Sequence, residues 1–221
     1  MKDFPLFTTE YGVASLILKE VPYRGVAFIH IRQAQDGRFE EHLKECVSFC
    51  RMVGAERILA KGHEALVQYP LHSIVYSMSM PLIRQEPEAC LWPVTEETVT
   101  KWREVYNNGM RGIDNHATMT ARDEQKIIQS GGAYFVHRDG TLLGIGWMEG
   151  NELLALVSVI PGMGETVART LFTAAQTDRI TLEVVSTNQR AIRLYERMGF
   201  VKTGEVSRWY RVWEDEQGAE N

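Results

Sequence analysis

The stretch from Ile180 to Phe200, ITLEVVSTNQRAIRLYERMGF, constrains the fold more than any other part of the chain. Its first part, up to Ser186, is rich in β-branched and aliphatic residues whose apolar side chains alternate, which is typical of a strand. Apolar residues then recur at helical spacing after Asn188, and Gly199 stands where a helix end favours a residue that tolerates positive φ. The pattern predicts a strand, a helix and a second strand, with free backbone N–H groups at the helix start.

Length and charge exclude several classes of protein. The chain has 221 residues, enough for one large domain or two small ones, and a net charge of −5 without the basic excess of a nucleic-acid binder. No apolar run is long enough to span a bilayer, and the N-terminal segment lacks the apolar core of a signal peptide. An odd count of three cysteines fits a reducing compartment. We therefore expect a cytoplasmic monomer or homodimer that binds neither nucleic acid nor membrane.

Two local features allow a second interpretation. Cys46 and Cys50 lie four residues apart on an expected helix, and we predict buried thiols, because the local sequence offers no further ligands for a metal. The C-terminal stretch RWYRVW alternates aromatic and basic residues, and Trp209 or Trp213 could stack on nucleic-acid bases. The acidic net charge favours packing of these aromatic residues on a sheet instead.

The first half of the chain reads as a small α/β unit of order β-β-α-β-β. A turn at Pro22–Gly25 separates the first two expected strands, and an amphipathic helix follows the second. The expected elements are strands at Tyr11–Lys19, Val26–Arg32, Ile58–Ala60 and Ser73–Met80, and a helix at Phe39–Val53. Prolines between Pro81 and Pro93 mark a linker to the second half.

The second half predicts two helices followed by antiparallel strands and then a crossover. Thr95 is the expected N-cap of the first helix, which extends towards Met110, and Thr120 is expected to start the second helix, which extends through Ile128. Asp139-Gly140 predicts a hairpin turn. The later elements are expected as a buried strand at Leu153–Val159, a helix at Glu165–Gln176, and an antiparallel pair at Phe200–Thr203 and Val206–Trp213.

Five residues at fixed spacing resemble the last motif of the GCN5-related N-acetyltransferase (GNAT) superfamily: Asn188, Ala191, Tyr195, Gly199 and Phe200. The resemblance implies an α/β (α+β) GNAT fold, a mixed central sheet with splayed parallel strands flanked by helices. It implies that Asn188, Arg190 and Ala191 line the site of acetyl-CoA. It also implies that the hydroxyl of Tyr195 protonates the departing thiolate. A plain strand-helix-strand unit with the tyrosine in the core is the alternative.

The segment before this motif is similar to the acetyl-CoA loop of the same family. The resemblance assigns cofactor binding to residues of the buried strand and the following turn, namely Val157, Ser158, Val159, Gly162, Met163, Gly164, Glu165 and Thr166. Amides of such a turn bind pyrophosphate at a helix N-terminus. This chain departs from the family pattern, because Met163 stands at the usual Gln or Arg position and Thr166 replaces the middle glycine.

Catalytic and acceptor residues are expected near these strands. The family's general base corresponds to about Leu153, and we assign that role to Glu152, provided that a β-bulge shifts the register; Glu149, Glu183 or water are alternatives. Asp114 and His116 lie in a loop that walls the acceptor site in the family, although a solvated turn would carry the same residues. No metal is expected.

The expected organisation is therefore a partial, cofactor-free GNAT-like domain at 1–93, without a glycine-rich turn before its helix, and a GNAT acetyltransferase domain at 94–221. The expected activity is transfer of an acetyl group from acetyl-CoA to a primary amine of a small molecule or peptide, by direct attack in a ternary complex. The alternative is a catalytically weakened module that binds CoA or a small ligand for regulation.

Overall fold

A computed structural model describes residues 6–215 of the chain. The described residues form two compact units, of which the first comprises 6–74 together with 207–215, and the second comprises Val75–Val206. The strands β5 (Leu71–Pro81) and β11 (Val201–Glu214) each pass from one unit into the other. Residues 207–215 therefore belong to the first compact unit, although they follow the second in sequence.

The first unit is a sheet of strand order β1-β2-β3-β4-β11 with the helix α2 packed on it. Only β3 and β4 are parallel among the pairs described here, because α2 crosses between them. The elements are β1 (Leu6–Thr9), β2 (Gly12–Ile17), α1 (Val21–Arg24), β3 (Val26–Ala34), α2 (Phe39–Met52), β4 (Arg57–Lys61) and the 3-10 helix η1 (Glu64–Gln68). The expected strands and the amphipathic helix are confirmed, while the expected turn at Pro22–Gly25 is the short helix α1.

The cysteines of α2 lie where its apolar face meets this sheet. Cys46 and Cys50 are both free and fully buried, as their helical spacing predicts. Burial disfavours the thiolate, and the pKa of each thiol is raised to about 12. These thiols are therefore inert core residues at neutral pH.

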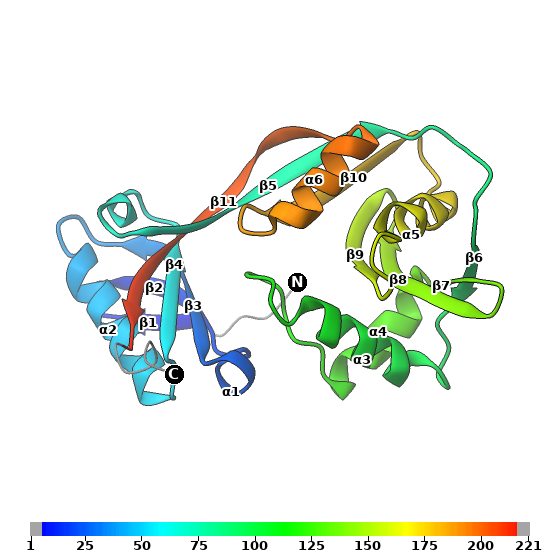
Figure 1. Cartoon of the computed structure of the whole chain (residues 1–221). Coiled ribbons are helices and arrows are strands. Elements are labelled where there is room, and N and C mark those ends of the chain that lie inside the picture. The colour runs from blue at the N-terminus through cyan, green and yellow to red at the C-terminus, as the bar shows by residue number, and fades with distance from the viewer. Residues whose placement is uncertain (1–5, 216–221) are drawn as a thin grey trace. The chain divides into compact units, whose positions relative to one another are not determined.

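The second unit has the strand order β5-β10-β9-β8-β7-β6, with the first part of β11 beside β5. Its helices α5 and α6 cover one face of the sheet, and α3 and α4 cover the other (Figure 1). The elements are β6 (Cys90–Pro93), α3 (Val99–Met110), α4 (Ala121–Ser130), β7 (Ala133–Arg138), β8 (Thr141–Glu149), β9 (Glu152–Ser158), α5 (Gly164–Leu171), the 3-10 helix η2 (Phe172–Ala174), β10 (Arg179–Val185) and α6 (Gln189–Met198). This mixed α+β arrangement confirms the expected fold class.

Local signals located several elements of this unit correctly. Thr120 caps α4 in a capping box with Asp123, and Gly131 ends that helix at a φ of 63°. Asp139 and Gly140 both have positive φ in the tight hairpin between β7 and β8. Each of these features depends on a short run of residues, which is why the sequence predicts it.

Four expectations are wrong in their bounds. Helix α3 begins at Val99 with Thr98 as its N-cap, and the expected cap, Thr95, lies before the turn that precedes the helix. Helix α5 ends at Leu171, and a 3-10 turn replaces its expected last part. The expected linker contains β6, which pairs with β7. The expected strand pair at the C-terminus is one continuous strand, β11.

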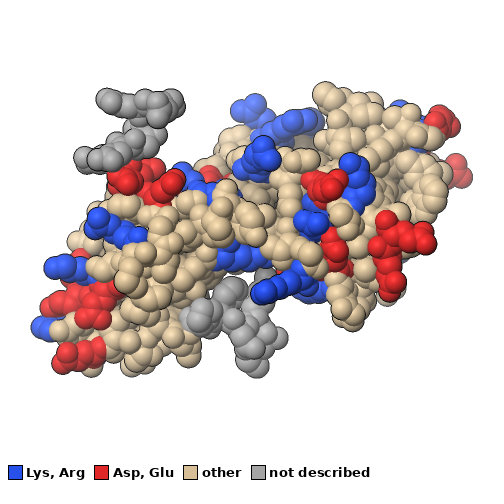
Figure 2. Space-filling view, turned by 90° about the horizontal axis from the view of Figure 1, so that it is seen from below, with Lys and Arg blue, Asp and Glu red and all other residues tan. Residues whose placement is uncertain are grey.

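The distribution of surface charge and the lengths of the helices agree with what the net charge and the apolar runs of the sequence predict. Figure 2 shows Lys and Arg side chains interspersed with Asp and Glu on the face that it presents, so the described residues form no extended basic field there. Among the described residues, no helix combines the length and the apolar character that crossing a bilayer requires.

Candidate active site

The parallel strands β9 and β10 are joined at one end only. Their backbone pairing is confined to Thr181 with Glu152 and Leu182 with Leu153. No pairing joins the two strands beyond these residues, toward their carboxyl ends. We call the region between 154–158 of β9 and 183–185 of β10 the wedge. Its backbone N–H and C=O groups are not used by the neighbouring strand and are available to a ligand.

A β-bulge lies at the point where the strands separate. Trp147 of β8 is opposite Ala155, while the next residue, Met148, is opposite Leu153, so Leu154 is an extra residue in β9. A bulge bends its strand and ends regular pairing. Leu154 is 38% exposed, an unusual fraction for a leucine inside a sheet. The bulge gives a physical reason for the separation of β9 from β10.

The bulge also changes the face of the sheet on which the later side chains of β9 lie. Leu153 packs in the core with α5 and α6, whereas Ala155 and Val157 pack with α3 and α4. In a regular strand these alternate residues would share one face. Glu152, as the neighbour of Leu153, therefore lies on the α3–α4 side, which is the side that Ala155 and Val157 occupy after the bulge.

Alternation of hydrogen bonds decides which amides of β9 face the wedge. The N–H of Val159 donates to the carbonyl of Leu143 at 2.9 Å, on the β8 side. In an antiparallel ladder the amide of Val157 has the same direction, and that of Ser158 has the opposite one. Leu156 and Ser158 therefore present their backbone groups to the wedge. The family resemblance assigned cofactor binding to Val157 and Ser158 and missed Leu156, because only the ladder reveals the direction of each amide.

The turn before α5 contains a glycine with positive φ and leaves backbone N–H groups free at the start of the helix. Gly162 has a φ of 85°, and a Cβ there would meet no atom within 4 Å. Glycine is therefore favoured at this position by its backbone conformation and not by lack of space. Met163 caps the helix, and the first intrahelical bond joins the N–H of Val167 to its carbonyl. The N–H groups of Gly164, Glu165 and Thr166 thus lie outside the intrahelical ladder.

At the start of α5, the acidic residue Glu165 is paired with a cation, and the hydroxyl of Thr166 contacts a second carboxylate. Arg169 lies one turn along the helix, and its Nε and Nη2 bond to one carboxylate oxygen of Glu165 at 2.9 and 2.8 Å. The acidic residue next to the turn is therefore paired with a cation, which weakens its repulsion of an anion. The hydroxyl of Thr166 donates to Glu88 at 3.5 Å.

Asn188 begins α6 beside the wedge. Its side-chain oxygen accepts from the N–H of Ala191 at 3.1 Å, which is an N-cap contact. Arg190 is exposed in the first turn, and Gly199 ends the helix at a φ of 99°. The strand, the helix and the glycine stop expected from the sequence are confirmed, the N-cap contact of Asn188 is an additional finding, and the role of Asn188 and Arg190 toward a cofactor stays a prediction.

Tyr195 lies on the inner side of α6. Its residue is 8% exposed, and its ring packs against Phe200 with centroids 5.5 Å apart. Desolvation by the surrounding core raises the pKa of the phenol far above its usual range. Tyr195 therefore packs in the core, as the alternative interpretation expects, and its raised pKa makes it a weaker acid than a free phenol; its role toward a departing thiolate stays a prediction.

Three carboxylates gather where the paired ends of β9 and β10 meet the wedge. Glu149 is the hairpin partner of Glu152, and Glu183 is on the adjacent strand. Burial first, and then the negative charges of Glu183 and Glu149, raise the pKa of Glu152. Glu183 alternates with Leu182 and Val184, which face α5 and α6, so it lies on the same side of the sheet as Glu152.

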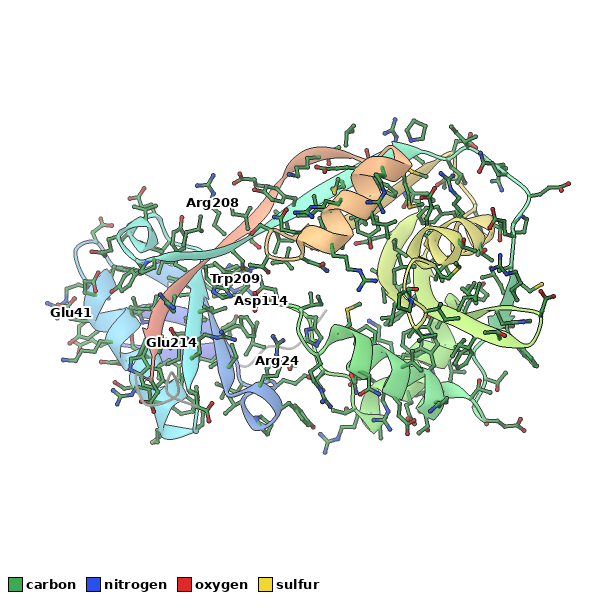
Figure 3. The ribbon with its side chains drawn as sticks, viewed as in Figure 1. Arg24, Glu41, Asp114, Arg208, Trp209 and Glu214 are labelled. Carbon is green, nitrogen blue, oxygen red and sulfur yellow. The ribbon has the colours of Figure 1, made fainter. Side chains whose placement is uncertain are left out.

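The loop after α3 is held near the second half of β9. A Cβ on Gly109 would lie 2.3 Å from Cγ1 of Val157, so α3 approaches β9 closely just before the loop. In that loop, His116 donates from Nδ1 to the carbonyl of Ile113 at 2.5 Å. Asp114 is half-buried on the same loop (Figure 3). Their expected contact with an acceptor stays a prediction.

The comparisons agree with this geometry. Residues 99–200 match the model of the acetyltransferase (GNAT) family. No relative was found among curated proteins. Many solved structures share the fold.

Three of these structures cover most of the chain. A GCN5-related N-acetyltransferase of Sphaerobacter thermophilus has a TM-score of 0.55 at 12% identity, over 92% of this chain and 77% of its own. A functionally unknown conserved protein of Staphylococcus epidermidis has a TM-score of 0.57 at 10% identity, over 95% and 93%. A tandem GNAT protein from the clavulanic acid biosynthesis pathway has a TM-score of 0.54 at 15% identity, over 91% and 78%.

The matched segment runs from the first residue of α3 to the residue that follows the glycine stop of α6. It includes the bulged strand, the turn before α5 and the Asn188–Tyr195 helix. Residues 99–200 of this chain therefore form a domain of the acetyltransferase (GNAT) family.

Proposed function

We propose that this protein is an acyl-CoA-dependent N-acyltransferase that moves an acetyl group from acetyl-CoA to a primary amine of a small molecule or peptide. The attack is direct and takes place in a ternary complex. The observation that carries the proposal is the end of pairing between β9 and β10 beside the bulge at Leu154. A pair of parallel strands would ordinarily be joined along its length, and the separation leaves backbone groups for a ligand.

The residues present fit acetyl-CoA. The backbone groups of Leu156 and Ser158 would bind the amides of the pantetheine arm as an added strand does. The free N–H groups of the first turn of α5 would bind the pyrophosphate, where the helix dipole favours an anion. When bound, acetyl-CoA supplies a thioester that is already activated toward attack by an amine.

The two proton transfers of the reaction would take place on opposite faces of the sheet, one at Glu152 and the other at Tyr195. Glu152 lies on the α3–α4 side, where a carboxylate with a raised pKa can accept the proton of an incoming ammonium group. Tyr195 belongs to the core on the α5–α6 side and holds a proton that can pass to the departing sulfur. The amide of Ser158 can polarise the carbonyl. The base, Glu152, would then lie on the side from which the amine approaches the carbonyl. The acid, Tyr195, would lie on the side of the departing sulfur.

We also propose a partial GNAT-like domain without a cofactor, expected at 1–93, and a catalytic domain, expected at 94–221, with the difference that residues 75–93 belong to the second compact unit and 207–215 to the first. In support, the first unit has an antiparallel strand pair followed by a parallel pair with a crossover helix. One structural neighbour of this chain is described as a tandem GNAT protein. The turn before α2 has no run of glycines that could bind pyrophosphate.

Titration calorimetry of the whole chain with acetyl-CoA, followed by an assay of thiol release with a panel of amines, tests the proposal. We expect micromolar binding and amine-dependent release of one thiol per acetyl group transferred. Binding without release would favour the regulatory module, which the altered loop also suits, since Met163 replaces the usual Gln or Arg. Absence of binding would contradict both functions.

Replacing Glu152 with Gln should lower turnover and raise stability in the same protein. The raised pKa of Glu152 means that the folded state holds this proton more tightly than the unfolded chain, so the folded state loses relative stability as pH rises through that pKa. The variant should therefore be more stable than the original at pH 7, with a difference that disappears in acid, where the carboxyl group is protonated. Urea unfolding at several pH values measures this.

The dependence of the rate on pH tests whether Glu152 is the general base, with Glu149→Gln as the control variant. Glu149→Gln removes one negative neighbour, which should lower the pKa of Glu152 and move the acidic limb of the profile to lower pH without abolishing turnover. A Glu152→Gln variant with the original profile would assign the base to another group or to water.

A further inference from the structure

Arg138 lies at the start of α5, although it comes from a distant strand. It is the last residue of β7, directly before the tight turn at Asp139 and Gly140. Its Nη2 atom is 4.0 Å from the sulfur of Met163, the residue that caps α5. The guanidinium group therefore stands beside the position where the family resemblance leads one to expect a Gln or Arg side chain.

A carboxylate is present at the same place. Glu88, from the segment that precedes β6, has its Oε2 atom 3.7 Å from Nη1 of Arg138. The same oxygen accepts from the hydroxyl of Thr166, in the first turn of α5, at 3.5 Å. A negative group thus lies between a guanidinium, a hydroxyl and the positive end of a helix dipole, which are the partners that a phosphate prefers.

Arg169, the other cation at this helix start, is already occupied. Its guanidinium bonds to Glu165 at 2.8 and 2.9 Å and to Gln85 at 3.2 Å. The contact of Arg138 with Glu88 is longer, and the two side chains are 41% and 72% exposed. Exposed pairs of this kind contribute little to stability, so an anion of higher charge can replace Glu88 at small cost.

We propose that Arg138 binds a phosphate of the coenzyme, and that Glu88 pairs with Arg138 when the coenzyme is absent and competes with it for this cation. The inference rests on the proposed function, because it assumes that the start of α5 receives the coenzyme. It explains how the loop can do without a Gln or Arg at Met163: β7 provides the guanidinium from outside the loop. The shared chemistry is that of a phosphate, in either the pyrophosphate or the 3′-phosphate of CoA.

Calorimetric titration of the whole chain with CoA tests this, using Arg138→Gln and Glu88→Gln. Loss of one charge-assisted contact should weaken binding of the Arg138→Gln variant about 10- to 100-fold. Removal of the competing carboxylate should strengthen binding of the Glu88→Gln variant by about two- to fivefold. Arg197→Gln is the matched control, since Arg197 is an exposed residue at the opposite end of α6 from Asn188 and its replacement changes the net charge equally.

Dephospho-CoA separates the two phosphate groups. An equal penalty for Arg138→Gln with CoA and dephospho-CoA would assign the contact to the pyrophosphate, and a penalty found only with CoA would assign it to the 3′-phosphate. Wild-type affinity in Arg138→Gln, or an equal loss in the Arg197→Gln control, overturns the inference while leaving the proposed function standing. If the wild-type chain itself fails to bind CoA, the proposed function and this inference both fall.

Discussion

Tyr195→Phe should lower turnover by about 100- to 10,000-fold while changing the affinity for CoA by less than about threefold. The variant removes only the hydroxyl, and the ring keeps its packing against Phe200. The phenol is protonated at neutral pH and can donate a hydrogen bond to the departing sulfur, while burial, which raises its pKa, makes complete transfer of the proton less favourable. Steady-state kinetics with acetyl-CoA and an active amine, together with calorimetric titration of CoA, measure the two quantities separately.

Tyr134→Phe is the matched control for this variant. Tyr134 is half-buried in β7 of the same unit and lies outside the wedge, so loss of its hydroxyl should leave turnover near that of the original protein. An unchanged rate for Tyr195→Phe would remove Tyr195 from the role of acid. A loss of CoA affinity equal to the loss of turnover would instead indicate that the hydroxyl supports binding of the coenzyme.

Gly109→Ala should destabilise the protein by about 1–3 kcal/mol, although Ala is the better helix former by about 1 kcal/mol. The added Cβ would lie 2.3 Å and 2.8 Å from the two methyl groups of Val157 and 3.1 Å from its Cβ. A β-branched side chain has little rotational freedom with which to yield, so α3 has to move away from β9. Urea unfolding followed by tryptophan fluorescence measures the loss, because Trp102 and Trp147 lie in this core.

A second variant tests whether the contact with Val157 causes the loss of stability in Gly109→Ala. In a Val157→Ala background the two methyl groups are absent, and Gly109→Ala should then be neutral or stabilising by up to about 1 kcal/mol. Gly112→Ala is the control, because a Cβ at Gly112 meets no atom within 4 Å. Equal destabilisation by Gly109→Ala in both backgrounds would show that the contact with Val157 is not the cause.

Much of the candidate site follows from short stretches of sequence. The alternation of β10, the helical spacing of α6 and the stop at Gly199 each involve residues within about two helical turns of one another. The hairpin at Asp139-Gly140 is likewise local, because two adjacent residues provide both positive φ angles. Such features depend on backbone geometry and on neighbouring side chains, and the sequence therefore predicts them.

Other parts of the site depend on pairings between distant segments. The sequence shows Glu152 and Leu153 as neighbours on a strand, but the bulge at Leu154 depends on how β9 is matched to β8. The direction of the Leu156 and Ser158 amides follows from the same ladder. Arg138 has no motif around it, and its position beside Met163 arises because α5 packs over the strands of its sheet.

The sequence by itself determined the elements around this site: a strand, a helix that carries a phenol and ends at a glycine, and a turn with free amides. Only the tertiary structure decided that β9 and β10 separate after Leu153 and Leu182, and that Glu152 shares a face with Ala155 and Val157. The physical reason is that helix caps and tight turns are encoded within a few residues. Sheet register and bulges are set by hydrogen bonds between strands, whose matching no single segment specifies.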